Sequence, residues 1–99
     1  MFVWLSTKKS TDFGKELAKM LLELMPKDIP LNDSKRASKS NYAKQKMRKR
    51  IAQFKQEEIL NFYKTAKLLN SFKWDLKDAG YDKETTNAFA SWILVCLRS

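Results

Sequence analysis

The sequence predicts an all-α protein: a small three- or four-helix bundle forming a single domain over residues 1–99, with a basic segment between the first and second helices. Twelve Leu and eight Ala outweigh the six Ile and Val, which favours helices over strands. Two Gly and two Pro leave few positions for the tight turns of a β-sandwich or barrel. Apolar residues also recur at three-and-four spacing, the period of an amphipathic helix.

The first helix is predicted over residues 12–25, where the apolar positions are Leu17, Met20, Leu21, Leu24 and Met25. Ser10, Thr11 and Asp12 are all residue types that cap helix N-termini. Residues 26–33 contain both prolines and predict a connector, because proline breaks a helix.

Helical spacing resumes near Ser40 and continues in two groups of apolar residues, first Ala43, Met47, Ile51 and Phe54, then Phe62, Ala66, Leu69, Phe72 and Leu76. A single helix from 41 to 79 would be about 58 Å long, which is unusual in a small domain. We therefore expect a break, either at residues 56–58, where Glu58 interrupts the apolar stripe, or at residues 70–71.

A stop and a new start are predicted around residue 80. Gly80 suits a left-handed C-terminal cap, Tyr81 can fold back on the helix that ends there, and Asp82 can cap the next helix. The final helix, residues 83–98, is expected to bury one face, with Ala88 beside Phe89, Trp92, Ile93, Cys96 and Leu97.

The composition argues against an enzyme. The chain has no histidine and one cysteine, Cys96, so histidine-based catalysis and multi-thiolate zinc sites are excluded. Neither glycine opens a phosphate-binding loop. We expect no catalytic residue, no metal and no cofactor. The lone cysteine and the missing secretory pattern predict a cytoplasmic protein without a transmembrane segment.

The positive charge is concentrated in one segment. Residues 1–34 and 56–99 each carry equal numbers of acidic and basic side chains, so the whole net charge of +9 lies in residues 35–55, which contain no acid. The predicted nucleic-acid-binding residues are Lys35, Arg36, Lys39, Lys44, Lys46, Arg48, Lys49, Arg50 and Lys55. Mutual repulsion among so many cations opposes compactness, which suggests an anionic partner.

A basic helix over residues 41–56 would fit the major groove of DNA while its apolar stripe holds it to the bundle. The leading hypothesis is therefore a small non-enzymatic nucleic-acid-binding or regulatory protein that contacts phosphates of DNA or RNA. The alternative is a protein-interaction module, an inhibitor or adaptor that docks an acidic partner. A solvated charged face and an anionic membrane surface also remain open. Lys35-Arg36 and Arg48-Lys49-Arg50 resemble a bipartite nuclear-import signal, so a nuclear location is possible where the host has a nucleus.

A second candidate surface lies opposite the apolar stripe of residues 59–79 and comprises Leu60, Tyr63, Lys67 and Trp74. Two aromatic side chains there predict either an interaction face or a surface covered by the apolar N-terminal residues 2–5. Tyr and Trp also stack on unpaired bases, which links this face to single-stranded nucleic acid. The sequence leaves these interpretations open.

Overall fold

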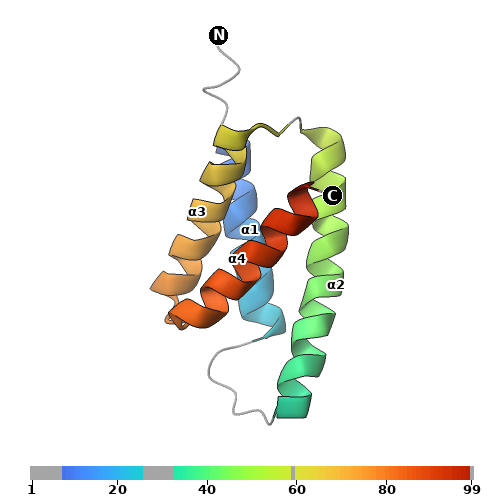
Figure 1. Ribbon diagram of the computed structural model, residues 1–99, viewed down its shortest axis with the longest axis vertical. Coiled ribbons are helices and arrows are strands. Elements are labelled where there is room, and N and C mark those ends of the chain that lie inside the picture. Colours follow the sequence, from blue (N-terminus) through green and yellow to red (C-terminus); the bar gives the residue numbers. More distant parts are fainter. Residues whose placement is uncertain (1–7, 26–32, 59, 99) are drawn as a thin grey trace.

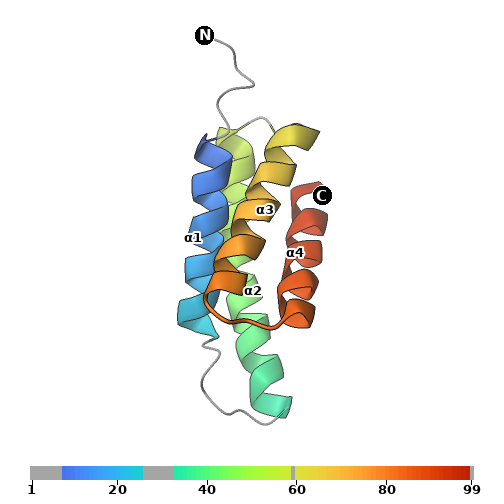
Figure 2. The same ribbon diagram turned by 90° about the vertical axis from the view of Figure 1, so that its left-hand side faces the viewer.

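The computed structural model describes residues 8–25, 33–58 and 60–98, and this part of the chain forms four α-helices and no strands. The helices are α1 (Lys8–Leu24), α2 (Asp33–Glu57), α3 (Phe62–Asp78) and α4 (Lys83–Arg98). They form a bundle in which α1 packs on α2 and α3, and α4 lies across α2 and α3 on the opposite side (Figures 1 and 2). The all-α prediction is confirmed.

All four helices contribute to one hydrophobic core. Its most deeply buried large side chains include Leu17 and Leu21 of α1, Met47 and Ile51 of α2, and Phe72 of α3. The predicted apolar positions of residues 43–54 all fall in this core, so the buried face of α2 is the one that its sequence period predicts.

Both α1 and α2 begin earlier in the sequence than predicted. α1 begins at Lys8, so the three candidate caps, Ser10, Thr11 and Asp12, all lie inside the helix, and Ser10 is fully buried there. α2 begins at Asp33 instead of Ser40, so the basic segment 35–55 lies within the second helix and not before it. Residues 34–38 are exposed and have no apolar period, but Lys, Arg and Ala are good helix formers and extend a helix that packing has already nucleated.

The break between α2 and α3 comes at residues 58–61, close to the first of the two predicted positions, and none occurs at 70–71. Asn61 caps α3, its side-chain oxygen accepting a 2.8 Å hydrogen bond from the backbone N–H of Lys64. The link resets the helical phase, so the apolar stripe does not simply continue from α2. Phe62, predicted on the buried face, is 84% exposed, and Leu68 is fully buried in its place.

α3 ends in the predicted cap. Gly80 has φ 97°, and the N–H groups of Gly80 and Tyr81 bond to the carbonyls of Lys77 and Leu76, the pattern of a Schellman motif. The Tyr81 hydroxyl donates to the Met25 carbonyl, which ties this turn to the end of α1.

The predicted face of α4 is partly wrong. Phe89, Ile93 and Leu97 are buried, but Trp92 and Cys96 are only half-buried, and Ala90 packs in the core while Ala88 is exposed. α4 is therefore rotated slightly from its expected orientation, with the Trp92 edge turned toward α2.

Candidate nucleic-acid interface

The orientation of α2 decides which of its cations can meet a partner. Ala43, Met47, Ile51 and Phe54 are each at most 6% exposed and fix one side of the helix against the core. The nine predicted nucleic-acid-binding residues are therefore distributed over the two flanks and the outer side of α2, and only some of them face solvent.

Arg50 turns toward α1. Its guanidinium donates to both carboxylate oxygens of Glu16, with Nε–Oε2 and Nη2–Oε1 distances of 2.5 and 3.2 Å. It also lies 5.1 Å from the centre of the Phe13 ring, which stacks on Phe54 at 4.1 Å. Arg50 thus stabilises the α1–α2 contact, and its charge is offset within the protein.

Three more cations turn toward α4. The ammonium group of Lys44 and the guanidinium of Arg48 lie 5.7 and 5.6 Å from the Trp92 ring, the geometry of cation–π attraction. Lys55 donates a 3.1 Å hydrogen bond to the carbonyl oxygen of Cys96 in the last turn of α4, where a cation complements the helix dipole. Lys44 and Lys55 are half-buried in the contact between α2 and α4, whereas Arg48 contacts Trp92 from an exposed position.

Arg36 and Lys39 lie near the N-terminal end of α2. Lys39 is half-buried, whereas Arg36 is exposed and lines a cavity of about 550 Å³ together with Asp82 of the α3–α4 turn. The hydrogen bond from the Thr85 N–H lowers the pKa of Asp82 from its ordinary value, and the charge of Arg36 lowers it further. Arg36 therefore faces a carboxylate of its own chain.

The remaining three cations form the outer ridge of α2: Lys35, Lys46 and Lys49. At 3.6 residues per turn they lie within about 60° of one another on the helix surface. All three are exposed, as is Tyr42, over whose ring the Lys46 ammonium lies at 5.5 Å. Each points away from the core stripe, so the outer ridge is the part of the predicted set that is best placed to meet an external anion.

Three of the four residues predicted for the second candidate surface, Tyr63, Lys67 and Trp74, are exposed on α3. Tyr63 and Trp74 are 48% and 69% exposed, and the Lys67 ammonium lies 5.5 Å from the Tyr63 ring. Leu60 does not belong to this face, because it is half-buried and packs on the core. The N-terminal residues 2–5, considered as a possible cover, lie outside the described residues.

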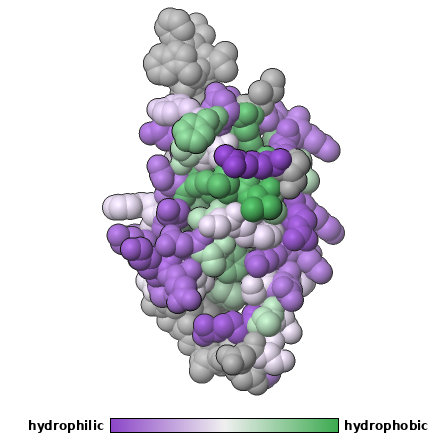
Figure 3. All heavy atoms as spheres, in the orientation of Figure 1, coloured by the Kyte–Doolittle hydropathy of each residue, from purple (hydrophilic) through white to green (hydrophobic). Residues whose placement is uncertain are grey.

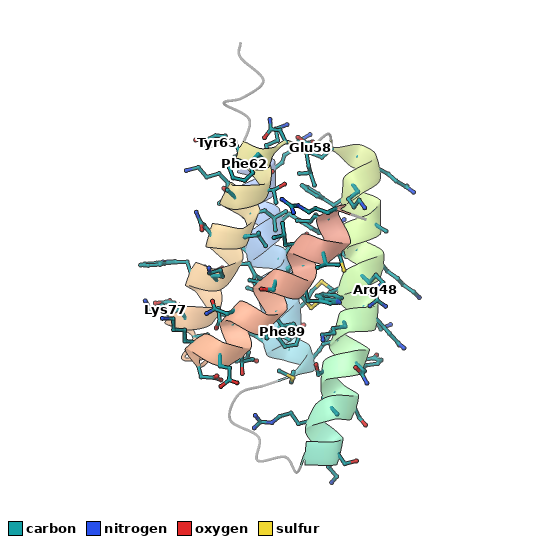
Figure 4. The ribbon with its side chains drawn as sticks, viewed as in Figure 1. Arg48, Glu58, Phe62, Tyr63, Lys77 and Phe89 are labelled. Carbon is teal, nitrogen blue, oxygen red and sulfur yellow. The ribbon has the colours of Figure 1, made fainter. Side chains whose placement is uncertain are left out.

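A buried ion pair, which sequence reasoning missed, lies at the end of the bundle where α2 leads into α3. Lys64 is only 4% exposed, and its ammonium lies 2.9 Å from a carboxylate oxygen of Glu58. A second oxygen of Glu58 is 3.9 Å from the exposed Lys9 ammonium. Figure 4 shows Glu58 in the link, at the same end as Phe62 and Tyr63. The interruption of the apolar stripe by Glu58 was the one sequence signal at this position.

Among the described residues, no cluster of three potential metal-ligating side chains occurs, and no helix is long and apolar enough to span a membrane. Comparison with protein-family models, with curated proteins and with solved structures finds no match to this chain.

Proposed function

We propose that the protein is a non-enzymatic nucleic-acid-binding protein that contacts phosphates through the outer ridge of α2, formed by Lys35, Lys46 and Lys49. The observation that carries this proposal is the exposure of these three cations on one side of a helix whose residues 34–56 include no acid. The apolar stripe on the opposite side holds the helix in place, so the ridge is presented on a rigid support.

The spacing of the ridge suits a phosphate backbone. Lys35 and Lys49 are 14 residues apart, about 21 Å along the helix, which equals the rise of about six nucleotides of one DNA strand. The N-terminal end of α2 extends beyond the other three helices (Figures 1 and 2), so its first turns, which carry Lys35, lie clear of α1 and α4. Long lysine side chains at these positions favour backbone contact without a fixed sequence.

Charge reversal on the ridge tests this proposal. Lys46→Glu with Lys49→Glu should weaken binding to duplex DNA, measured by fluorescence anisotropy at 50 mM salt, by at least about tenfold, because two phosphate contacts become repulsive. Arg50 is left unchanged, since its reversal would break the bond to Glu16 and confound binding with stability.

The matched control is Lys15→Glu with Lys19→Glu on α1, two exposed lysines whose reversal changes the net charge by the same amount. If both double variants lose affinity equally, binding follows net charge and the ridge has no special role. Unaltered binding by the ridge variant, or no binding by the wild-type protein to duplex or single strands, contradicts the proposal.

The α4 surface favours a second candidate, docking of an acidic protein. Residues 85–97 contain no charged side chain, although Val95 is 64% exposed. Figure 3 shows a hydrophobic band along the middle of the face on which Figure 1 places α4, with hydrophilic side chains on both sides. Such an arrangement suits an amphipathic acidic helix. Val95→Glu should abolish that interaction and leave DNA binding by the ridge unchanged.

A further inference from the structure

A cavity of about 500 Å³ opens between the second half of α3 and the first turns of α4. Its walls include Trp74 and Lys77 from α3, and Lys83 and Thr86 from α4. The volume lies within the range of small-molecule sites in proteins. The cavity is formed by residues outside the outer ridge of α2, on the other side of the bundle.

Its lining is cationic. Lys73, Lys77 and Lys83 all line the cavity. Among the described residues, no acidic side chain lines the cavity and none of the three lysines forms an ion pair. The nearby Asp82 lines a different cavity together with Arg36, and its carboxylate accepts a hydrogen bond from the Thr85 N–H. Three lysines in the lining of one cavity favour a ligand that carries a phosphate or similar anion.

An aromatic ring stands at the same opening. Trp74 lies on the cavity wall and is 69% exposed, although burial of a tryptophan is strongly favourable. A flat apolar ring beside cations is the arrangement on which unpaired bases stack. A paired base in a duplex is covered on both faces by its neighbours, so the ligand that fits is single-stranded.

A buried hydroxyl completes the site. Thr86 lines the cavity and is 5% exposed, and its Oγ1 has no hydrogen-bond partner among the described residues. An unsatisfied buried hydroxyl is costly. Threonine in a helix adopts two χ1 rotamers, and rotation from one to the other moves the hydroxyl to a different staggered position. The hydroxyl can thereby reach a ligand in the cavity, where the side-chain amides of Asn70 and Asn87 also lie.

We propose that this α3–α4 cavity binds one unpaired nucleotide of a single-stranded nucleic acid, with the base on Trp74 and the phosphate between Lys73, Lys77 and Lys83. The Thr86 hydroxyl and the two asparagine amides supply hydrogen bonds to the base edge or sugar. The site goes beyond the proposed contact of α2 with phosphates, because it uses other residues and selects single strands over duplex.

The test is titration of the ¹⁵N-labelled protein with a single-stranded thymidine hexamer, with thymidine monophosphate and with inorganic phosphate. The indole N–H signal of Trp74, assigned by its loss in Trp74→Phe, should shift with the hexamer and more weakly with the monophosphate. The backbone amides of Thr86 and Asn87 should shift with it. Inorganic phosphate at the same concentration should leave the indole signal unmoved.

Four variants separate the contributions. Trp74→Ala should weaken hexamer binding about tenfold or more, in line with the loss of one stacked base, whereas Trp74→Phe should lose less. Thr86→Val should weaken binding while leaving the melting temperature unchanged or raised, because the hydroxyl it removes has no partner in the free protein. Phe62→Ser, at the exposed start of the same helix and outside the cavity, should leave binding unchanged.

Binding of a nucleotide in the α3–α4 cavity can be tested separately from phosphate binding by the outer ridge of α2. The Lys46→Glu, Lys49→Glu variant should retain the Trp74 shift, since those residues lie on α2. The proposal is overturned if the indole signal does not move with any probe, if phosphate alone moves it as far as the hexamer, or if poly-glutamate produces the same shifts. Equal effects of Trp74→Ala and Phe62→Ser would also overturn it.

Discussion

A Cβ built on Gly14 would lie 2.3 Å from the carbonyl oxygen of Leu68, and 3.1 Å from the backbone nitrogen of Phe72. The backbones of α1 and α3 therefore approach each other more closely than any side chain at position 14 permits. The same contact is fastened by the Ser71 hydroxyl, which donates a 2.8 Å hydrogen bond to the Thr11 carbonyl. This close crossing sets where α3 lies and hence where Trp74 is presented.

Gly14→Ala should destabilise the protein. The new methyl group meets backbone, which cannot rotate away, so α1 must shift from α3 at a cost of about 1–3 kcal/mol or more. Alanine gains about 1 kcal/mol of helix propensity, which offsets only part of this loss. Thermal melting followed by circular dichroism should show a lower midpoint, whereas Lys15→Ala at the exposed neighbouring position should change little. A raised midpoint for Gly14→Ala would refute the close crossing.

The buried pair of Lys64 and Glu58 should show strong coupling. Lys64→Met leaves the Glu58 carboxylate, whose side chain is only 12% exposed, with the exposed Lys9 ammonium at 3.9 Å as its cation. We expect a loss of about 3–5 kcal/mol in denaturant unfolding. Adding Glu58→Leu should recover most of it, because the double variant buries no unpaired charge. Additive losses in the double-mutant cycle would show that the two side chains do not interact.

Exchanging the two residues of the Arg50–Glu16 ion pair should preserve much of its contribution to stability. Arg50→Glu places two carboxylates together at the α1–α2 contact and should lower the melting temperature. Adding Glu16→Arg should restore much of the loss. Because both side chains are about a third exposed, we expect a coupling of about 1 kcal/mol or less. The absence of any recovery would indicate that the cation–π contact with Phe13, and not the ion pair, accounts for the role of Arg50.

Local patterns predicted most of the helical segments and the cap at the end of α3, because those depend on residues near in sequence. The stripe from Ala43 to Phe54 identified the buried face of α2, and Gly80 and Asp82 marked the change from α3 to α4. Phe62 was misplaced because the stripe was continued through a link that breaks the helical phase. The period of a helix carries no information across such a break.

The sequence predicted which segment carries the candidate interface, but not which of its side chains face outward. Nothing in the sequence pairs Arg50 with Glu16, 34 residues away, or directs Lys55 to the carbonyl of Cys96. These contacts depend on how the helices pack, and they divide the basic segment into cations that hold the bundle together and cations that face outward. The requirement for glycine at position 14 is likewise a property of the helix crossing and has no local signal.

Asp82 gives the protein an acid-dependent helix cap. Its carboxylate accepts a 2.9 Å hydrogen bond from the Thr85 N–H, which lowers the pKa of Asp82. A lowered folded-state pKa means that this contribution is present above the unfolded-state value of about 3.9 and is lost as the pH falls through the folded-state value. Asp82→Asn keeps the cap without the titration. The melting temperature of the wild-type protein should fall more than that of Asp82→Asn between pH 5 and pH 2, and parallel curves would contradict this assignment.

Salt dependence should report how much of α2 touches nucleic acid. If only Lys35, Lys46 and Lys49 of the outer ridge meet phosphates, about three counterions are released, and the slope of log K against log salt on duplex DNA should be about −2.7. Affinity would then fall about fortyfold between 50 and 200 mM salt. Engagement of all nine cations of residues 35–55 would instead give a slope of about −8, which would require Arg50 and Lys55 to leave Glu16 and Cys96. The Lys46→Glu, Lys49→Glu variant should reduce the slope to about −0.9, because one ridge cation remains. A slope near zero in the wild-type protein would mean that its affinity does not come from phosphate contacts, and the outer ridge would then have no part in binding.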